Sequence, residues 1–124
     1  MYRYITPVNL GTLRRNEIIV FGCESGMHEE GLLGQTYPIP VVGKKVTEKT
    51  VNKSIDRFTE FASEHPDLVF YVVEIGHGCK IMPAYKIAMM FFEASKLPNV
   101  YLPRIYWDEL EYGKELESIV LNEL

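Results

Sequence analysis

Apolar residues along the chain fall into short continuous runs and into helically spaced stripes, and the two patterns alternate. Residues 17–21 are largely apolar and β-branched and are followed by a glycine, which predicts a strand buried on both faces. Residues 35–42 are expected to be extended, at a sheet edge or only partly paired, because Pro38 and Pro40 cannot donate to a ladder. Residues 68–73 are hydrophobic throughout, which is typical of a central parallel strand.

Three- and four-residue spacings predict helices between and after these strands. Thr47 can cap a first helix that ends at His65, because the residue before a proline is pushed out of the α region. A second helix is expected to begin near Pro83. The inward positions are expected to be Val51, Ile55, Phe58 and Ala62 in the first helix and Ala84, Ile87, Phe91 and Ala94 in the second. A short strand at residues 99–102 and an acidic helix at residues 108–124 complete the chain.

This order of elements predicts one α/β domain over residues 1–124, with three layers and a largely parallel sheet that carries helices on its faces. The composition agrees, because 47% apolar and 24% charged residues are ordinary for a globular protein. No apolar run is longer than that of residues 87–92, which is far shorter than the roughly 20 residues that span a bilayer. The first residues also lack the apolar core of a secretory signal. We therefore expect a cytoplasmic protein with no membrane partner.

Charge and cysteine usage exclude further classes. Residues 108–124 hold six acidic side chains against Lys114 alone, a net charge of −5, and the rest of the chain is close to neutral. Duplex-binding proteins usually carry a basic field, so we expect no sequence-specific nucleic-acid partner. Cys23 and Cys79 form no CxxC pair, and with the three histidines they show no tight ligand spacing. Neither a disulfide scaffold nor a metal site is predicted.

Two glycine-bearing loops follow the two most hydrophobic strands. In open α/β sheets, ligands bind beyond the carboxyl ends of the strands, and glycine lets backbone N–H groups approach a phosphate or ribose closely. The two loops side by side would form a cleft for a nucleotide-like ligand. The chain has no GxGxxG and no Walker A motif, which argues against a dinucleotide reductase or a P-loop enzyme. The candidate ligand-binding residues are Gly22, Cys23, Glu24, Ser25, Gly26, His28, Gly34, Gln35, Gly76, His77, Gly78, Cys79 and Lys80.

Catalysis at these loops has a short list of candidates. His77, His28 and Glu24 are the possible acid or base groups, and a cysteine–histidine nucleophilic pair is conceivable. For each cysteine we favour the simpler explanation, a small buried hydrophobe at the end of a strand. Glu74 can bind a ribose hydroxyl or pair with a nearby cation. We expect no resident cofactor, and we favour binding over catalysis.

Several stretches resemble a family of small phage-borne and bacterial proteins labelled as phage non-structural proteins. The resemblance lies in residues 13–22, 34–40 and 68–78, with His65-Pro66 and residues 97–100, and it covers most of residues 5–103. The resemblance implies a protein of a bacterial or phage-infected cell.

The loop pattern is also similar to that of macro domains, which bind ADP-ribose. The matching residues are Gly22, Gly26, His28 and Gly31 in the first loop and Gly76 and Gly78 in the second. This likeness implies a macro-like or Rossmann-like fold and an ADP-ribose-like ligand. The chain departs from the pattern in two ways. Cys23 and Glu24 stand where macro domains carry an asparagine, and a helix before Gly34 is missing.

Three functions follow from these patterns. The first is a binding protein for a nucleotide-derived small molecule that uses the two glycine loops. The second is a hydrolase of an ADP-ribosyl or nucleotide substrate with His77, His28 or Glu24 as the acid or base. The third is an interaction module without a working small-molecule site, in which the acidic tail and Trp107 contact a partner or form a homo-oligomer.

Overall fold

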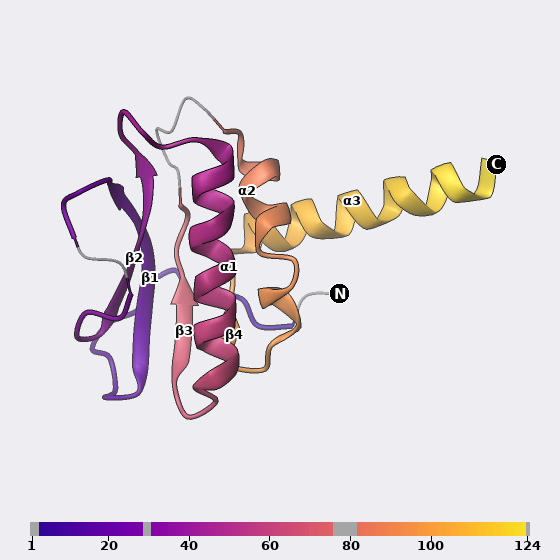
Figure 1. The fold of residues 1–124 in the computed structure, drawn as a ribbon. Coiled ribbons are helices and arrows are strands. Elements are labelled where there is room, and N and C mark those ends of the chain that lie inside the picture. The colour runs from indigo at the N-terminus through magenta and orange to yellow at the C-terminus, as the bar shows by residue number, and fades with distance from the viewer. Residues whose placement is uncertain (1–2, 29–30, 76–81, 124) are drawn as a thin grey trace.

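The chain forms a single α/β domain around a parallel sheet, as the order of elements predicted. The computed structural model describes residues 3–28, 31–75 and 82–123, and only the backbone of residues 114–123. The strands are β1 (Glu17–Glu24), β2 (Thr36–Val42), β3 (Val69–Val72) and β4 (Val100–Tyr101). All their pairings are parallel, in the order β2-β1-β3-β4 (Figure 1). The proline-bearing strand β2 lies at the edge, as expected.

The helices follow the sequence pattern closely where the apolar stripe is long. They are α1 (Glu48–Glu64), α2 (Ala84–Met90), the short 3-10 helix η1 (Ala94–Lys96) and α3 (Arg104–Glu123). Thr47 caps α1 and forms a capping box with Thr50, and His65 is its C-cap, so both predicted ends are confirmed. The predicted inward positions of α1 are all buried.

The second half of the chain differs from the expectation in two places. Helix α2 ends at Met90, so Phe91 and Ala94 are buried beyond the helix, whereas Ala84 is exposed. The C-terminal helix starts at Arg104, before its acidic segment, because Tyr106 and Trp107 pack into the core. Aromatic burial rather than the charge pattern therefore sets where α3 begins.

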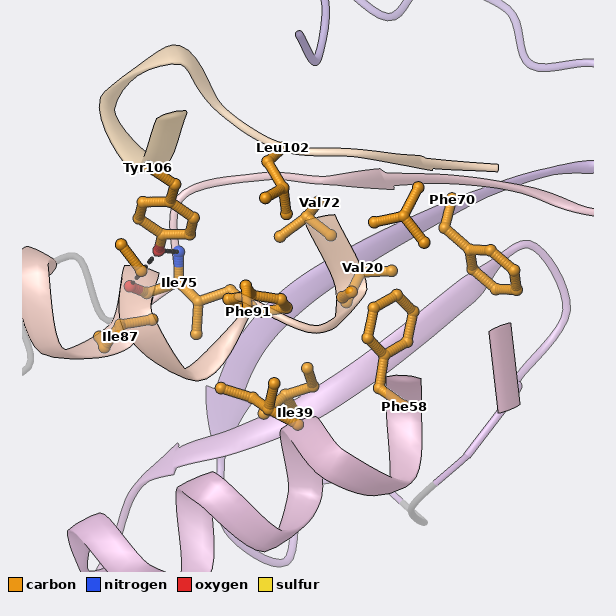
Figure 2. Packing of buried hydrophobic residues seen from close by; sticks show 14 of the residues in the cluster. Val20, Ile39, Phe58, Phe70, Val72, Ile75, Ile87, Phe91, Leu102 and Tyr106 are labelled. Atoms are coloured by element: carbon orange, nitrogen blue, oxygen red, sulfur yellow. Dashed lines mark hydrogen bonds between the residues drawn. The ribbon is translucent and has the colours of Figure 1, made fainter. Parts of the chain in front are cut away.

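One face of the sheet carries the hydrophobic core. Side chains from alternate positions of the strands, such as Val20 and Val72, meet Phe58 of α1 and Phe91 after α2 (Figure 2). In the described part of the chain the helices pack on this face. The intervening positions, including Tyr71, are only half-buried. The predictions of strands buried on both faces and of three layers are therefore corrected to burial on one face and, in the described residues, two layers. A continuous apolar run does not reveal how many faces of a sheet are covered.

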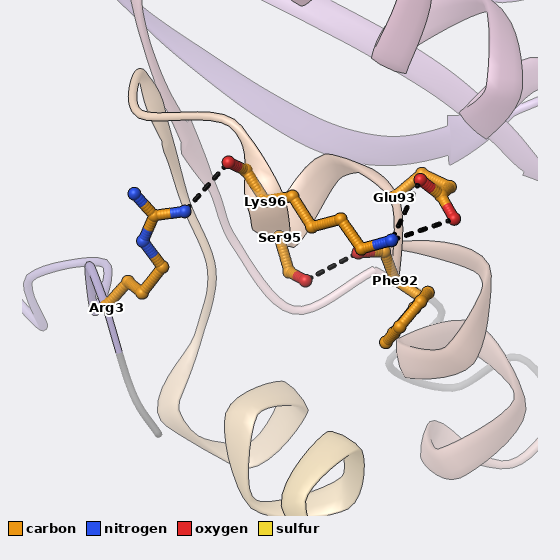
Figure 3. Close-up of polar contacts among 5 residues, drawn as sticks. All are labelled: Arg3, Phe92, Glu93, Ser95 and Lys96. Atoms are coloured by element: carbon orange, nitrogen blue, oxygen red, sulfur yellow. Dashed lines mark hydrogen bonds and ion pairs between the residues drawn. The ribbon is translucent and has the colours of Figure 1, made fainter. Parts of the chain in front are cut away.

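The N-terminal segment extends the sheet beyond β4, which the sequence pattern did not reveal. The Thr6 amide donates to the Leu102 carbonyl at 2.9 Å, and the Leu102 amide donates to the Tyr4 carbonyl at 3.1 Å. Arg3 also donates from its guanidinium to the Lys96 carbonyl of η1 at 2.8 Å (Figure 3). These bonds cover the open edge of the short strand β4, which would otherwise expose unpaired backbone groups.

The side chain of Asn99, which is buried just before β4, connects this strand to the end of α1 and to the turn that leads into β3. Its amide nitrogen lies 3.0 Å from each of the carbonyl oxygens of Ala62, His65 and Leu68. These groups belong to the end of α1 and to the turn that leads into β3. The carbonyls of Ala62 and His65 also accept from the backbone amides of His65 and Leu68, so the Asn99 side chain adds a second donor to each and also reaches the Leu68 carbonyl. A buried amide that contacts several carbonyls in this way fixes the turn.

Candidate functional site

The predicted site lies where the connections of the sheet diverge. After β1 the chain leads to β2 on one side, and after β3 it leads through α2 to β4 on the other side. Because β1 and β3 are parallel neighbours, their carboxyl ends lie side by side. We call this border of the sheet, formed by the ends of the strands, the carboxyl edge. Ligands of open α/β sheets bind in the crevice at such a switch point. The strand order therefore brings the roots of both predicted glycine loops to adjacent positions.

The end of β1 is shaped by a close approach to the end of β2. The pairing with β2 shifts register between Cys23 and Glu24, and the Ser25 amide then donates to the Val42 carbonyl at 2.7 Å. A Cβ on Gly43 would lie 2.9 Å from the Ser25 Cβ, and Gly43 has a φ of 147°. Glycine is therefore required at this point, and its absence of a side chain lets the first loop turn tightly beside β2.

Strand β1 runs three residues further than predicted, so Gly22, Cys23 and Glu24 lie in the strand and not in the glycine loop. Burial raises the pKa of the Cys23 thiol, which is the opposite of the shift found in activated nucleophilic cysteines. His28 is exposed, and its ring stands edge-on to Phe21 with 5.8 Å between the ring centroids. Glu24 and Ser25 are both exposed at the edge. These surroundings suit contacts with a ligand better than nucleophilic attack by Cys23.

The end of β3 is held by a buried tyrosine that the sequence analysis did not single out as a site residue. The Tyr106 hydroxyl accepts a hydrogen bond from the Ile75 amide at 2.6 Å and donates one to the Ile75 carbonyl at 2.9 Å (Figure 2). Burial raises the pKa of Tyr106 far above its ordinary value. The neighbouring Glu74 is exposed at the same edge. No local sequence pattern predicts this contact, because Tyr106 and Ile75 are 31 residues apart.

Gly34 and Gln35 lie at the opposite border of the sheet, where the strands β1 and β2 begin. The Ile19 amide pairs with the Gln35 carbonyl just before β2 begins. The Gln35 side-chain amide donates to the carbonyls of Arg14 at 2.6 Å and Glu17 at 3.1 Å. Since β1 and β2 are parallel, the segment between them must return along the sheet to the amino end. The structure thus separates these two predicted ligand residues from Cys23, Glu24 and Ser25.

The second glycine loop falls outside the described residues. Its predicted ligand residues are Gly76, His77, Gly78, Cys79 and Lys80. Ile75 and Met82, the described residues on either side of this segment, are both buried.

Basic groups gather at the same edge of the sheet from the turn after β2. Lys44 and Lys45 are exposed in that turn, and Lys49 is exposed in the first turn of α1. The N-terminus of a helix carries partial positive charge and favours anions. The edge that carries Glu24 and Glu74 therefore also carries cationic groups.

Comparison with known proteins finds no matching family model, no matching curated protein and no matching solved structure. Across the described residues, none of the helices combines the length and apolarity needed to cross a membrane. The same residues contain no cluster of three or more histidine, cysteine or acidic side chains placed to hold a metal ion.

Proposed function

We propose that the protein binds a nucleotide-derived small molecule, similar to ADP-ribose, in the crevice between the carboxyl ends of β1 and β3. The observation that carries this proposal is the strand order β2-β1-β3-β4, which creates a switch point between the two strands that precede the glycine loops. Crevices of this kind are the usual ligand sites of open α/β sheets.

The charges at this edge support a ligand that combines phosphate with hydroxyl groups. Lys44, Lys45 and the N-terminus of α1 offer partners for phosphate. The exposed carboxylates of Glu24 and Glu74 offer acceptors for ribose hydroxyls. A purely anionic ligand would meet repulsion from these carboxylates, whereas a nucleotide presents both kinds of group.

Binding without turnover is favoured over catalysis. The raised pKa of Cys23 keeps its thiol neutral at physiological pH, so it is a poor nucleophile. The ring of His28 contacts the aromatic ring of Phe21. Hydrolysis of an ADP-ribosyl substrate remains an outcome that the experiment detects, because product formation can be followed in the same samples.

A thermal-shift screen with ADP-ribose, NAD and linear and cyclic nucleotides tests the proposal. A ligand at about 100 times its dissociation constant adds about 2.7 kcal/mol and raises the melting temperature by several degrees in a domain of this size. Glu74→Trp fills the crevice and should abolish the shift. Glu64→Trp makes the same exchange at the exposed end of α1, on the other edge of the sheet, and should retain it.

Two results would overturn the proposal. One is a flat response across the panel, which would favour an interaction module without a small-molecule site. The other is a shift that Glu64→Trp removes as fully as Glu74→Trp does, since it would place the ligand elsewhere.

A further inference from the structure

An apolar groove lies between α2 and α3, outside the proposed ligand crevice. It has a volume of about 390 Å³ and is lined by Tyr85, Met89, Glu109, Tyr112 and Gly113. Tyr85, Met89 and Tyr112 are 52%, 49% and 59% exposed, although each is large and largely apolar. Grouped exposure of this kind marks an interaction surface rather than the scattered apolar residues of an ordinary surface. Met89 follows the buried Ala88 on α2, yet its side chain forms a wall of this groove.

Helix α3 continues past the groove and away from the domain. Figure 1 shows its C-terminal half extending from the body of the molecule, far from the sheet and from α1. Residues 114–123 alone span about 15 Å at 1.5 Å per residue. A helical segment of this length is marginal in water without a packing partner.

The sequence of this projecting half provides an apolar stripe. Leu116, Ile119 and Val120 follow Tyr112 at spacings of four, seven and eight residues, which place positions on one side of a helix. Tyr112 itself lines the groove. The stripe therefore continues directly from the groove along the same helix.

We propose that the chain forms a two-fold symmetric dimer in which the stripe of each α3 lies in the α2/α3 groove of the other copy. The groove and the stripe adjoin on one chain. A two-fold axis between two copies therefore creates two identical groove–stripe contacts and places the two α3 helices antiparallel to each other. Self-complementary contacts of this kind are the usual basis of homodimers. A second copy thus covers the exposed apolar groove and gives the projecting half of α3 a packing partner.

Sedimentation velocity across a wide range of protein concentrations tests the dimer. The wild-type chain is expected to dimerise, and Ile119→Asp is expected to raise the dimer dissociation constant at least about tenfold, since a charge replaces an apolar group at the interface. Ser118→Asp is the matched control, because Ser118 adjoins Ile119 in sequence but falls outside the spacing of the stripe. It should dimerise as the wild type does.

A complementation experiment distinguishes the groove from simple pairing of tails. Met89→Asp places a charge in the groove on an exposed position, so it should prevent dimerisation without unfolding the domain, which circular dichroism checks. Mixing Met89→Asp with Ile119→Asp leaves one intact groove and one intact stripe. The mixture should therefore form heterodimers at concentrations at which each variant alone is monomeric. A wild-type chain that stays monomeric at every concentration would overturn the proposal. Equal loss in Ser118→Asp, or full dimerisation of Met89→Asp, would also overturn it.

Discussion

Replacing Tyr106 by phenylalanine removes one oxygen atom from the root of the proposed site. The hydroxyl makes two hydrogen bonds to the backbone of Ile75, and Tyr106 and Ile75 are only 1% and 3% exposed. Phenylalanine keeps the stacked contact with Phe91, whose ring centroid lies 5.8 Å away, but it leaves a buried N–H and a buried carbonyl without this partner. Each such group costs about 1–3 kcal/mol, so the loss of both should lower the free energy of unfolding of Tyr106→Phe by about 2–6 kcal/mol.

Urea denaturation at neutral pH measures this loss, and Tyr85→Phe is the matched control. Tyr85 is 52% exposed on α2, so removal of its hydroxyl should change the free energy of unfolding by less than about 0.5 kcal/mol. The Tyr106→Phe variant, and not the control, should also show faster hydrogen exchange of the Ile75 amide. If the free energies of unfolding of Tyr106→Phe and Tyr85→Phe agree within error, the two hydrogen bonds do not hold the end of β3 as described.

Three further predictions concern stability. Asn99→Ala removes the amide that serves three carbonyls and should cost about 2 kcal/mol or more in urea denaturation; an unchanged midpoint would contradict its bridging role. Gly113→Ala should stabilise the chain by about 0.5–1 kcal/mol, because glycine is unfavourable inside a helix and the new Cβ would lie 3.5 Å from the Met89 sulfur; a lower melting temperature would refute this packing. The hydrogen bond from Tyr71 to Glu17 lowers the pKa of Glu17 and raises the pKa of Tyr71 to about 12. The stabilisation from this hydrogen bond is therefore complete between about pH 5 and pH 10. It fades as the pH falls through the lowered pKa of Glu17 or rises towards 12, so the stabilities of wild type and Tyr71→Phe should converge at both extremes. A stability difference that stays constant with pH would contradict the bond.

Local patterns were informative where one element supplies its own signals. Helix α1 has a capping residue, Thr47, a regular apolar stripe and a terminating residue, His65, and all three were predicted. The prolines of β2 indicated an edge strand, and the sheet order confirms it. These features depend on neighbouring residues alone, so they can be recognised before any tertiary contact is known.

Features that depend on distant contacts were not predictable in the same way. Gln35 follows the first glycine loop in sequence, yet the parallel pairing of β1 and β2 carries it to the opposite edge of the sheet. The early start of α3 depends on burial of Tyr106 against Ile75 and of Trp107, whose indole nitrogen donates to the Tyr4 carbonyl at 2.9 Å. The sequence thus indicated which residues are suited to the site but not which of them share an edge.

Mapping ADP-ribose binding residue by residue in solution tests the proposed site most directly. In a titration of the isotope-labelled protein followed by NMR, the proposal predicts that amide shifts cluster at Gly22 to Ser25 and at Glu74 and Ile75, where the carboxyl ends of β1 and β3 meet. The amides of Gln35 and Asp67, at the amino ends of the strands, should stay unchanged. Shifts that cluster at those amino ends, or an unchanged spectrum with ADP-ribose and with each nucleotide of the panel, would contradict the proposed function.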